Sequence, residues 1–305
     1  MQRLADWQLF AICVLTWGTT WHAVTYQVAA IAPEAGVAMR FGVAGALVLI
    51  ACRLRGIAIA CRARDHALLA LQGAFLYGLS YVAVYEAERH VASGLVAVGY
   101  SASPLLGGLG ARALFGTRIT GRFIGGGLLG LAGVALIFAP EFGAARGSDH
   151  VVRGATFTVA AVVLSSVGSL AASRNRTRGL PFWPGLGWGM VYGALTCVLL
   201  GLARGQDFTL PATPVWWLTF SYLVLAGSIL TFAAFLALQD RIGPGPTGAI
   251  GVMTPLLALA VSIAFEGFQP SLLTAAGAAL AVLGNVLMLR PRRSLRPPAR
   301  IAAAE

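Results

Sequence analysis

Apolar stretches of about 20 residues recur along the whole chain, separated by short polar segments. In α-helical form, a stretch of this length crosses the ~30 Å hydrocarbon core of a bilayer. The pattern therefore predicts an all-α integral membrane protein. Ten transmembrane helices are expected, at residues 7–29, 35–54, 67–87, 93–115, 121–140, 153–173, 183–203, 215–238, 245–266 and 271–290.

Composition agrees with a membrane protein whose surface faces lipid. Of the 305 residues, 58% are hydrophobic and only 11% are charged, with a mean hydropathy of +0.79. A soluble domain carries roughly 25% charged residues. The net charge of +11 lies mostly in short loops between apolar spans, where basic residues determine topology. We therefore expect membrane lipid, and no nucleic acid, as a partner.

The chain matches itself without gaps at an offset of 151 residues, from 81–138 against 232–289. Shared glycines and prolines carry the match because each marks a backbone requirement. The paired positions include Gly94 with Gly245, Pro104 with Pro255, Gly116 with Gly267, Gly126 with Gly277, and Gly133 with Gly284. The match predicts two five-helix repeats, 7–140 and 151–290, joined by the polar stretch 140–150. A basic, Pro-rich tail at 291–305 is expected to be disordered.

Five spans per repeat would insert the second repeat upside down relative to the first. Basic residues support this inversion: the loop after the fourth span carries Arg112, Arg118 and Arg122, whereas its counterpart after the ninth carries none. The resulting topology puts 17 of the 22 arginines on one side. By the positive-inside rule both termini are cytoplasmic, in a bacterial cytoplasmic membrane. A cleaved signal peptide is the alternative for the first stretch, but its length and the repeat favour a retained helix.

Three segments resemble a known family. They are WGTTW at Trp17–Trp21, MRFGVAGALVL at Met39–Leu49, and YEAERHVASGLVAVGYSASPLL at Tyr85–Leu106. With the duplicated proline they resemble the EamA-type branch of the drug/metabolite transporter superfamily. The resemblance implies a ten-helix secondary carrier that exports amino acids or similar small metabolites. One departure is visible: the family often has an acidic residue after both the fourth and ninth spans, whereas here Phe115 holds the first position and Glu266 the second.

Pro104 and Pro255 fall near the middle of spans four and nine. A proline there removes a helical hydrogen bond and leaves a backbone carbonyl free. Interrupted helices at matching positions of two inverted halves point to a binding site at the membrane midplane. We expect both helices to line a substrate pathway. A packing kink satisfied by neighbouring helices is the alternative.

Aromatic and hydroxyl side chains supply further candidates for the substrate pathway. In span one, His22 and Tyr26 share a helix face, and His22 is placed either to relay a proton or to make a structural hydrogen bond. The remaining candidates are Trp17 in span one, Tyr100 and Ser103 in span four, and Trp188 and Tyr192 in span seven. Such groups together suit an amphipathic small molecule.

Arg40, Glu86 and Glu88 are candidates for an outer gate or a coupling site. Arg40 lies about five residues into span two, and both glutamates end span three on the same side. A guanidinium close to hydrocarbon is stabilised by pairing, so a contact of Arg40 with Glu86 or Glu88 is expected. Snorkelling of Arg40 to the headgroups is the alternative.

Other classes of protein find little support in the sequence. Glu86 and Glu88 would point to opposite sides of a helix, and the four cysteines are widely spaced, so neither a metal site nor an enzyme is expected. No Walker sequence is present, and we expect no cofactor. Gly-x-x-x-Gly patterns such as Gly185–Gly189 allow close helix packing, within the bundle or in a homodimer. The alternative function is a membrane receptor or scaffold without transport activity.

Overall fold

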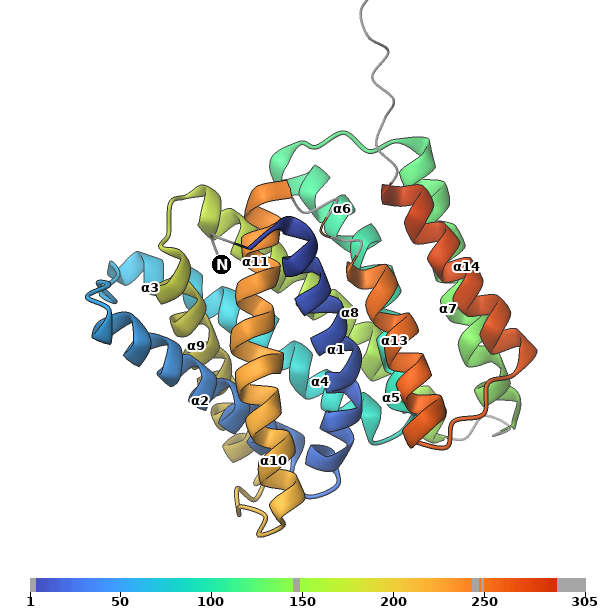
Figure 1. The fold of residues 1–305 in the computed structure, drawn as a ribbon, viewed down its shortest axis with the longest axis horizontal. Coiled ribbons are helices and arrows are strands. Elements are labelled where there is room, and N and C mark those ends of the chain that lie inside the picture. Colours follow the sequence, from blue (N-terminus) through green and yellow to red (C-terminus); the bar gives the residue numbers. More distant parts are fainter. Residues whose placement is uncertain (1–3, 145–148, 243–246, 248–249, 290–305) are drawn as a thin grey trace, which may run out of the picture.

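The computed structural model describes residues 4–144, 149–242, 247 and 250–289, and every regular element in them is helical (Figure 1). The elements of the first half are α1 (Asp6–Val28), α2 (Pro33–Leu54), α3 (Ala63–Gly73), η1 (Ala74–Leu79), α4 (Ser80–Glu88), α5 (Ser93–Gly99), η2 (Tyr100–Ala102), α6 (Ser103–Phe115) and α7 (Gly121–Ala144). Those of the second half are α8 (Asp149–Thr177), α9 (Phe182–Ala203), α10 (Pro214–Tyr222), η3 (Leu223–Leu230), α11 (Thr231–Ile242), α13 (Ile250–Phe265) and α14 (Leu272–Leu289).

The all-helical, membrane-type fold is confirmed. Six helical stretches are long and apolar enough to cross a membrane: 33–54, 63–88, 93–115, 149–177, 182–203 and 214–242. Shorter apolar helices occupy 121–137, 253–265 and 272–288, and α1 is 23 residues long. The helices begin and end close to the predicted spans. The joint is shorter than expected because α7 continues to Ala144 and α8 begins at Asp149. Residues 145–148 of the joint and the tail 291–305 lie outside the described residues.

Three of the long stretches change helix type along their length. The stretch 63–88 passes through the π segment η1, and the stretch 214–242 passes through the π segment η3. An offset of 151 places residues 74–79 at 225–230, inside η3, so the two π segments occupy matching positions of the predicted repeats. The fourth span instead contains the 3-10 turn η2. π turns inside α-helices are frequent at functional sites. The region where η1 and η3 lie is therefore a candidate functional region.

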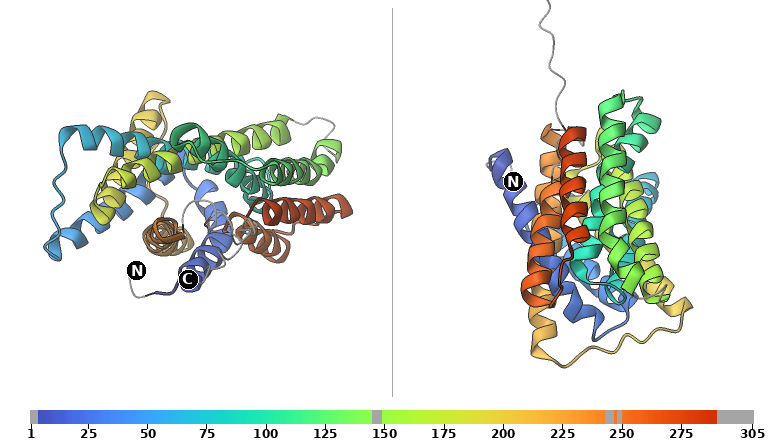
Figure 2. Two further views of the ribbon diagram at one scale, coloured as in Figure 1. Left: turned by 90° about the horizontal axis from the view of Figure 1, so that it is seen from above. Right: turned by 90° about the vertical axis from the view of Figure 1, so that its right-hand side faces the viewer.

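Helices α7 and α14 lie side by side at one edge of the bundle (Figures 1 and 2). Their contact depends on glycine, since a Cβ added at Gly126 would lie 2.5 Å from the carbonyl oxygen of Gly284. A Cβ added at Gly133 would lie equally close to the carbonyl oxygen of Gly277. Gly126 matches Gly277 and Gly133 matches Gly284 in the sequence repeat, so the pairs cross as they would about a two-fold axis.

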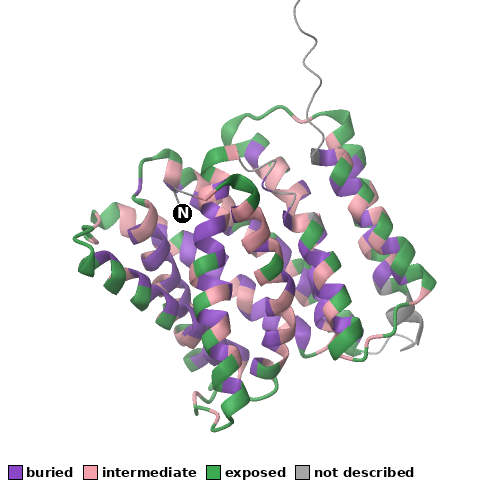
Figure 3. Cartoon of the chain, viewed as in Figure 1, coloured by how far each residue is buried: buried purple, intermediate pink, exposed green. Residues whose placement is uncertain are grey.

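Buried residues gather along the helices at the centre of the bundle, while the outward faces are exposed and rich in leucine and valine (Figure 3). The largest core cluster draws on α1, α2, α4, α8, α9, α10, α11 and the π segments. Gly189 and Gly193 pack against Tyr77, and Gly193 also faces the backbone of Gly73. Gly189 and Gly193 have the same spacing as Gly185 and Gly189, and both are used for packing within the bundle.

Candidate functional site

Arg40 lies in the interior of the bundle with 1% of its surface exposed. Helix α2 begins at Pro33 and carries Arg40 about two turns from that end. The Nε of Arg40 donates to Ser228 Oγ at 2.9 Å, and its Nη1 lies 3.5 Å from the Tyr85 hydroxyl. Because Ser228 belongs to η3, the arginine links α2 to the second half of the chain. No carboxylate oxygen of the described residues lies within 4.0 Å of Arg40.

Aromatic rings surround the guanidinium. Its carbon lies 5.1 Å from the ring centre of Phe41 and 4.9 Å from that of Tyr81, so both ring faces stabilise the charge. Tyr100 packs against the same core cluster as Tyr81, and its ring lies 5.4 Å from that of Trp21. We refer to this set as the Arg40 cluster: Trp21, Arg40, Phe41, Tyr81, Tyr85, Glu88, Tyr100 and Ser228.

Glu88 adds a carboxylate to the Arg40 cluster. It ends α4 and is 9% exposed, and neither of its carboxylate oxygens has a hydrogen-bond partner among the described residues. Arg40 and Glu266 lie within electrostatic range of it, although neither forms a short ion pair with it. Buried polar groups are nearly always hydrogen-bonded in folded proteins. A buried carboxylate without a partner is therefore a candidate for binding something that this chain does not supply.

A second polar group, the Glu266 cluster, lies where α13 ends and α5 begins, at the lower end of the bundle in Figure 1. It consists of His22, Ser93, Gly94, Ser262 and Glu266. The carboxylate of Glu266 accepts from the Ser93 backbone N–H at 3.2 Å, the Ser93 hydroxyl at 2.5 Å and the Ser262 hydroxyl at 2.9 Å. Its Oε1 also lies 3.1 Å from His22 Nδ1. These bonds hold α1, α5 and α13 together.

His90, in the loop between α4 and α5, meets His150 in the first turn of α8 at the same end. Their Nδ1 atoms lie 3.2 Å apart, and the His90 ring stacks on Phe157. Burial lowers the pKa of His90, and the neighbouring His150 lowers it further. The pair thus favours a neutral His90.

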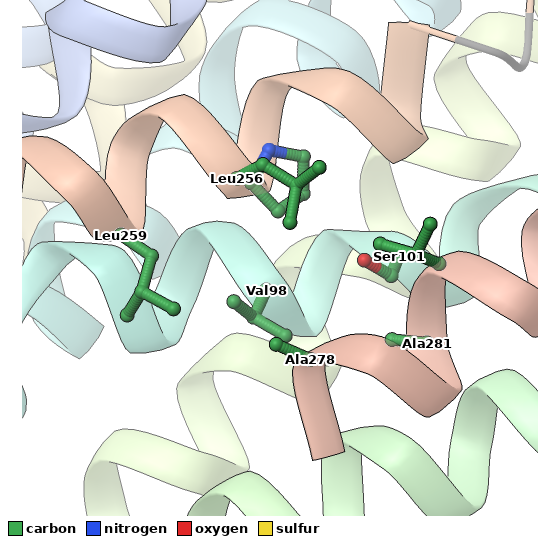
Figure 4. A pocket seen from close by; sticks show the side chains of 8 residues that line it. Val98, Ser101, Leu256, Leu259, Ala278 and Ala281 are labelled. Atoms are coloured by element: carbon green, nitrogen blue, oxygen red, sulfur yellow. The ribbon is translucent and has the colours of Figure 1, made fainter. Parts of the chain in front are cut away.

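The two matched prolines differ in their local structure. Pro104 follows the 3-10 turn η2 and stands in the first turn of α6, so the fourth span is interrupted where the sequence predicts. Pro255 lies inside α13, which is helical on both sides of it. Between α5, α13 and α14, Pro255 lines a small pocket (Figure 4). Its other lining residues are Val98, Ser101, Leu256, Leu259, Ala278, Ala281 and Val282, so the pocket is apolar apart from Ser101.

Some sequence candidates lie in or beside the Arg40 cluster. Tyr100 is part of it, and Trp17 packs edge-on against Phe232 at 5.2 Å between ring centres. The indole N–H of Trp17 and the hydroxyl of Ser103 are buried without a hydrogen-bond partner among the described residues. Like the carboxylate of Glu88, these two groups are therefore able to bind a solute in the interior.

Other candidates lie away from the cluster. Trp188 donates its indole N–H to the carbonyl of Ile59 at 2.8 Å, in the loop between α2 and α3. The Tyr192 hydroxyl lies 2.8 Å from Nδ1 of His66 in α3. Tyr26 is 43% exposed beside His22. The structure therefore brings His22 and Tyr26 together at the Glu266 cluster, and gives Trp188 and Tyr192 partners elsewhere.

The expected contact of Arg40 with Glu86 or Glu88 is not formed as an ion pair within the described residues. Glu86 instead lies 3.4 Å from half-exposed Arg89, one helical turn away. Arg40 does not snorkel either, because protein atoms rather than headgroups surround it.

Sequence reasoning missed several residues that the structure places in these clusters. Ser228, Tyr81 and Tyr85 of the Arg40 cluster gave no local signal, since hydroxyl-bearing residues recur throughout the spans. For the Glu266 cluster a signal existed, because Glu266 is an acidic residue directly after an apolar span. Its serine partners at 93 and 262 could not be deduced without knowing which helix ends meet.

Comparisons with known proteins point to transport. The family model described as the EamA-like transporter family matches the chain twice, at residues 7–139 and 152–290. Protein PagO of Salmonella typhimurium (strain LT2) is 22% identical over 283 residues, which cover 89% of this chain and 88% of that protein. A protein of known crystal structure superposes with a TM-score of 0.67 at 22% identity, covering 92% of this chain and 94% of the other. That likeness shows the same fold.

Proposed function

Because this chain belongs to the EamA-like transporter family and is a membrane transporter, we propose that it exports amino acids or similar small metabolites by alternating access. The Arg40 cluster is the observation that carries this proposal. A charged residue inside a membrane bundle is costly and marks a substrate or ion pathway more often than a packing role. Its partner Ser228 comes from the other half of the chain, as expected for a site between two moving halves.

In this proposal ten helices cross the bacterial cytoplasmic membrane as two inverted repeats, 7–140 and 151–290, with both termini in the cytoplasm. The glycine contacts between α7 and α14 support the inversion. Each glycine faces the repeat counterpart of the other glycine on its own helix, as two inverted copies related by a two-fold axis would. The matching positions of η1 and η3 also support it. The Glu266 cluster then lies on the outer side, and the basic loop at 116–120 lies inside.

Counterflow in proteoliposomes tests this function. Purified protein is reconstituted with an excess of one unlabelled solute inside, and uptake of the same labelled solute is followed with and without a proton gradient. The panel covers amino acids, nucleosides and small organic cations. Transient accumulation of a solute is expected, and its response to the gradient reports coupling to protons.

Folded protein that binds a solute without exchanging it would support a receptor or scaffold instead. A double variant with bulky residues at the α7–α14 contact, Gly126→Leu and Gly133→Leu, serves as a reference for lost folding. Its monodispersity on size exclusion is compared with that of the wild type.

A further inference from the structure

We propose that Arg40 and Glu88 bind the two opposite charges of one zwitterionic solute, with the solute's carboxylate at Arg40 and its ammonium group at Glu88. This assignment rests on the transport function proposed above, and it names the class of substrate. The two residues come from α2 and α4 and share the interior of the bundle.

Arg40 is equipped to receive an anion. A guanidinium has five N–H donors, and the described residues supply two acceptors, Ser228 Oγ and the more distant Tyr85 hydroxyl. The ring faces of Phe41 and Tyr81 stabilise the positive charge but accept no conventional hydrogen bond. A planar carboxylate matches the fork geometry of the donors that remain.

Glu88 presents the opposite requirement. Both of its oxygens are buried and without a hydrogen-bond donor in the described part of the chain. Of the charges near it, Glu266 repels the carboxylate and Arg40 attracts it. An ammonium group has three N–H donors and a full positive charge, so it satisfies both oxygens and offsets the repulsion.

A solute with a single charge fits this arrangement less well. An anion at Arg40 would bring a third negative charge close to Glu88 and Glu266, whereas a cation at Glu88 would leave Arg40 without a carboxylate. Opposite charges on one molecule compensate both residues at once, which is favourable in a low-dielectric interior. Binding of a zwitterion therefore leaves the net charge of the site unchanged.

Aromatic side chains indicate where the rest of the solute would lie. Trp21 and Tyr100 form an edge-to-face pair, and the indole N–H of Trp21 is buried without a partner in the described chain. Tyr81 supplies a further ring beside Arg40. An apolar or aromatic substituent packs well against such a surface.

The experiment uses four probes with the same carbon skeleton and different charge in the proteoliposome counterflow assay. They share the 3-phenylpropanoyl skeleton: phenylalanine is zwitterionic, phenylalaninamide is a cation, 3-phenylpropionate lacks the amino group and is an anion, and 3-phenylpropanamide lacks it and is neutral. Wild-type protein is expected to exchange phenylalanine at least tenfold faster than the other three, because each lost charge removes a charge-assisted contact. Each probe is also measured with protein-free liposomes, to subtract passive leakage.

Variants assign each charge to its residue. Arg40→Gln is expected to abolish the preference for phenylalanine over phenylalaninamide. Glu88→Gln is expected to abolish the preference for phenylalanine over 3-phenylpropionate. Loss of overall rate alone would not separate binding from structure, so the ratio between probes is the readout. Glu86→Gln is the matched control, since this carboxylate lies on the same helix but pairs with Arg89.

The outcomes separate this inference from the transport function. Equal exchange of all four probes, or unchanged ratios in both variants, overturns the zwitterion site. Exchange of nucleosides or organic cations in the wider panel, without exchange of phenylalanine or other zwitterions, overturns the site and leaves transport standing. If Arg40→Gln does not fold, the test rests on the other two variants. The ratio of phenylalanine to 3-phenylpropionate exchange should then fall in Glu88→Gln and stay at the wild-type value in Glu86→Gln. Loss of exchange for every probe by folded Glu88→Gln shows a structural role and overturns the proposal.

Discussion

Nδ1 of His22 lies 3.1 Å from Oε1 of Glu266, across 244 residues of sequence. The same carboxylate accepts from the backbone N–H of Ser93, the first residue of α5, and so caps that helix from another part of the chain. A negative charge at a helix N-terminus is favourable because the orphan N–H groups and the helix dipole both point towards it. Glu266 therefore anchors the beginning of α5 to the end of α13.

Replacing Glu266 with alanine is expected to destabilise the protein by about 2 kcal/mol or more, because several hydrogen bonds to one charged group are lost together. His22→Ala should cost less, since Ser93 and Ser262 still hold the carboxylate. Thermal unfolding in detergent, followed by thiol-reactive dye or circular dichroism, measures both. Glu86→Ala is the control because its carboxylate pairs with half-exposed Arg89 at 3.4 Å instead of joining helix ends. Equal melting temperatures for Glu266→Ala and Glu86→Ala would contradict the anchor.

Neighbouring glycines of α7 offer a sharp test of the α7–α14 contact. Gly126→Ala places a methyl group 2.5 Å from the carbonyl oxygen of Gly284, and is expected to cost about 1–3 kcal/mol through forced separation of the helices. At Gly125 nothing lies within 4 Å, so Gly125→Ala should be neutral or slightly stabilising. Melting temperatures of the two variants are compared. A larger loss at position 125 would show that another surface of α7 makes the contact.

Pro104→Ala is expected to reduce exchange several-fold while leaving expression and melting temperature close to the wild type. The alanine supplies the N–H that proline lacks, so the 3-10 turn η2 can relax towards a regular α-helix. Counterflow rate and yield after purification are the two measurements. Pro255→Ala, in the uninterrupted α13, is run in parallel. If rate and yield fall in the same proportion, Pro104 is a packing residue.

The His90–His150 contact predicts a loss of stability in mild acid. Burial and His150 hold the pKa of His90 below its usual value, so the unfolded chain binds a proton more readily than the folded protein. Stability from this residue is therefore present above the ordinary histidine pKa of about 6.5 and falls as the pH drops below it. His90→Asn should reduce the drop in melting temperature between pH 7.5 and pH 5.5. An identical drop in the variant would assign the acid sensitivity to other groups.

Single cysteines at positions 269 and 118 test the inverted arrangement. In a cysteine-free background, Gln269→Cys should react with a membrane-impermeant maleimide in intact cells, and Arg118→Cys only after permeabilisation. Removal of the native cysteines matters most for Cys61, which lies in a loop, although burial raises the pKa of its thiol and slows its reaction. Labelling of both positions from the same side would eliminate the inverted repeats.

Hydrophobic pattern alone located the helices of this protein to within a few residues, because a bilayer-spanning helix needs a continuous apolar run and polar residues end it. Even the interruption at Pro104 follows from sequence, since proline cannot donate the hydrogen bond that a regular helix requires. The 151-residue offset likewise singled out four glycines that meet across α7 and α14, although they meet as the crossed pairs Gly126 with Gly284 and Gly133 with Gly277. The spans and the proline interruption depend on residues close together in the chain, and the repeat depends on comparing two segments of it, so none of these requires the tertiary structure.

Tertiary structure alone decided which side chains meet. Every face of these helices is largely apolar, so sequence does not reveal which face turns inward. Arg40 was expected to meet a glutamate that ends a neighbouring span, yet it bonds Ser228, 188 residues away, and Glu88 is left without a partner among the described residues. Trp188 looked equally suited to a substrate pathway, but its indole bonds a loop carbonyl. Close packing of small residues sets the rotation of each helix, and that rotation determines whether a polar side chain reaches the interior.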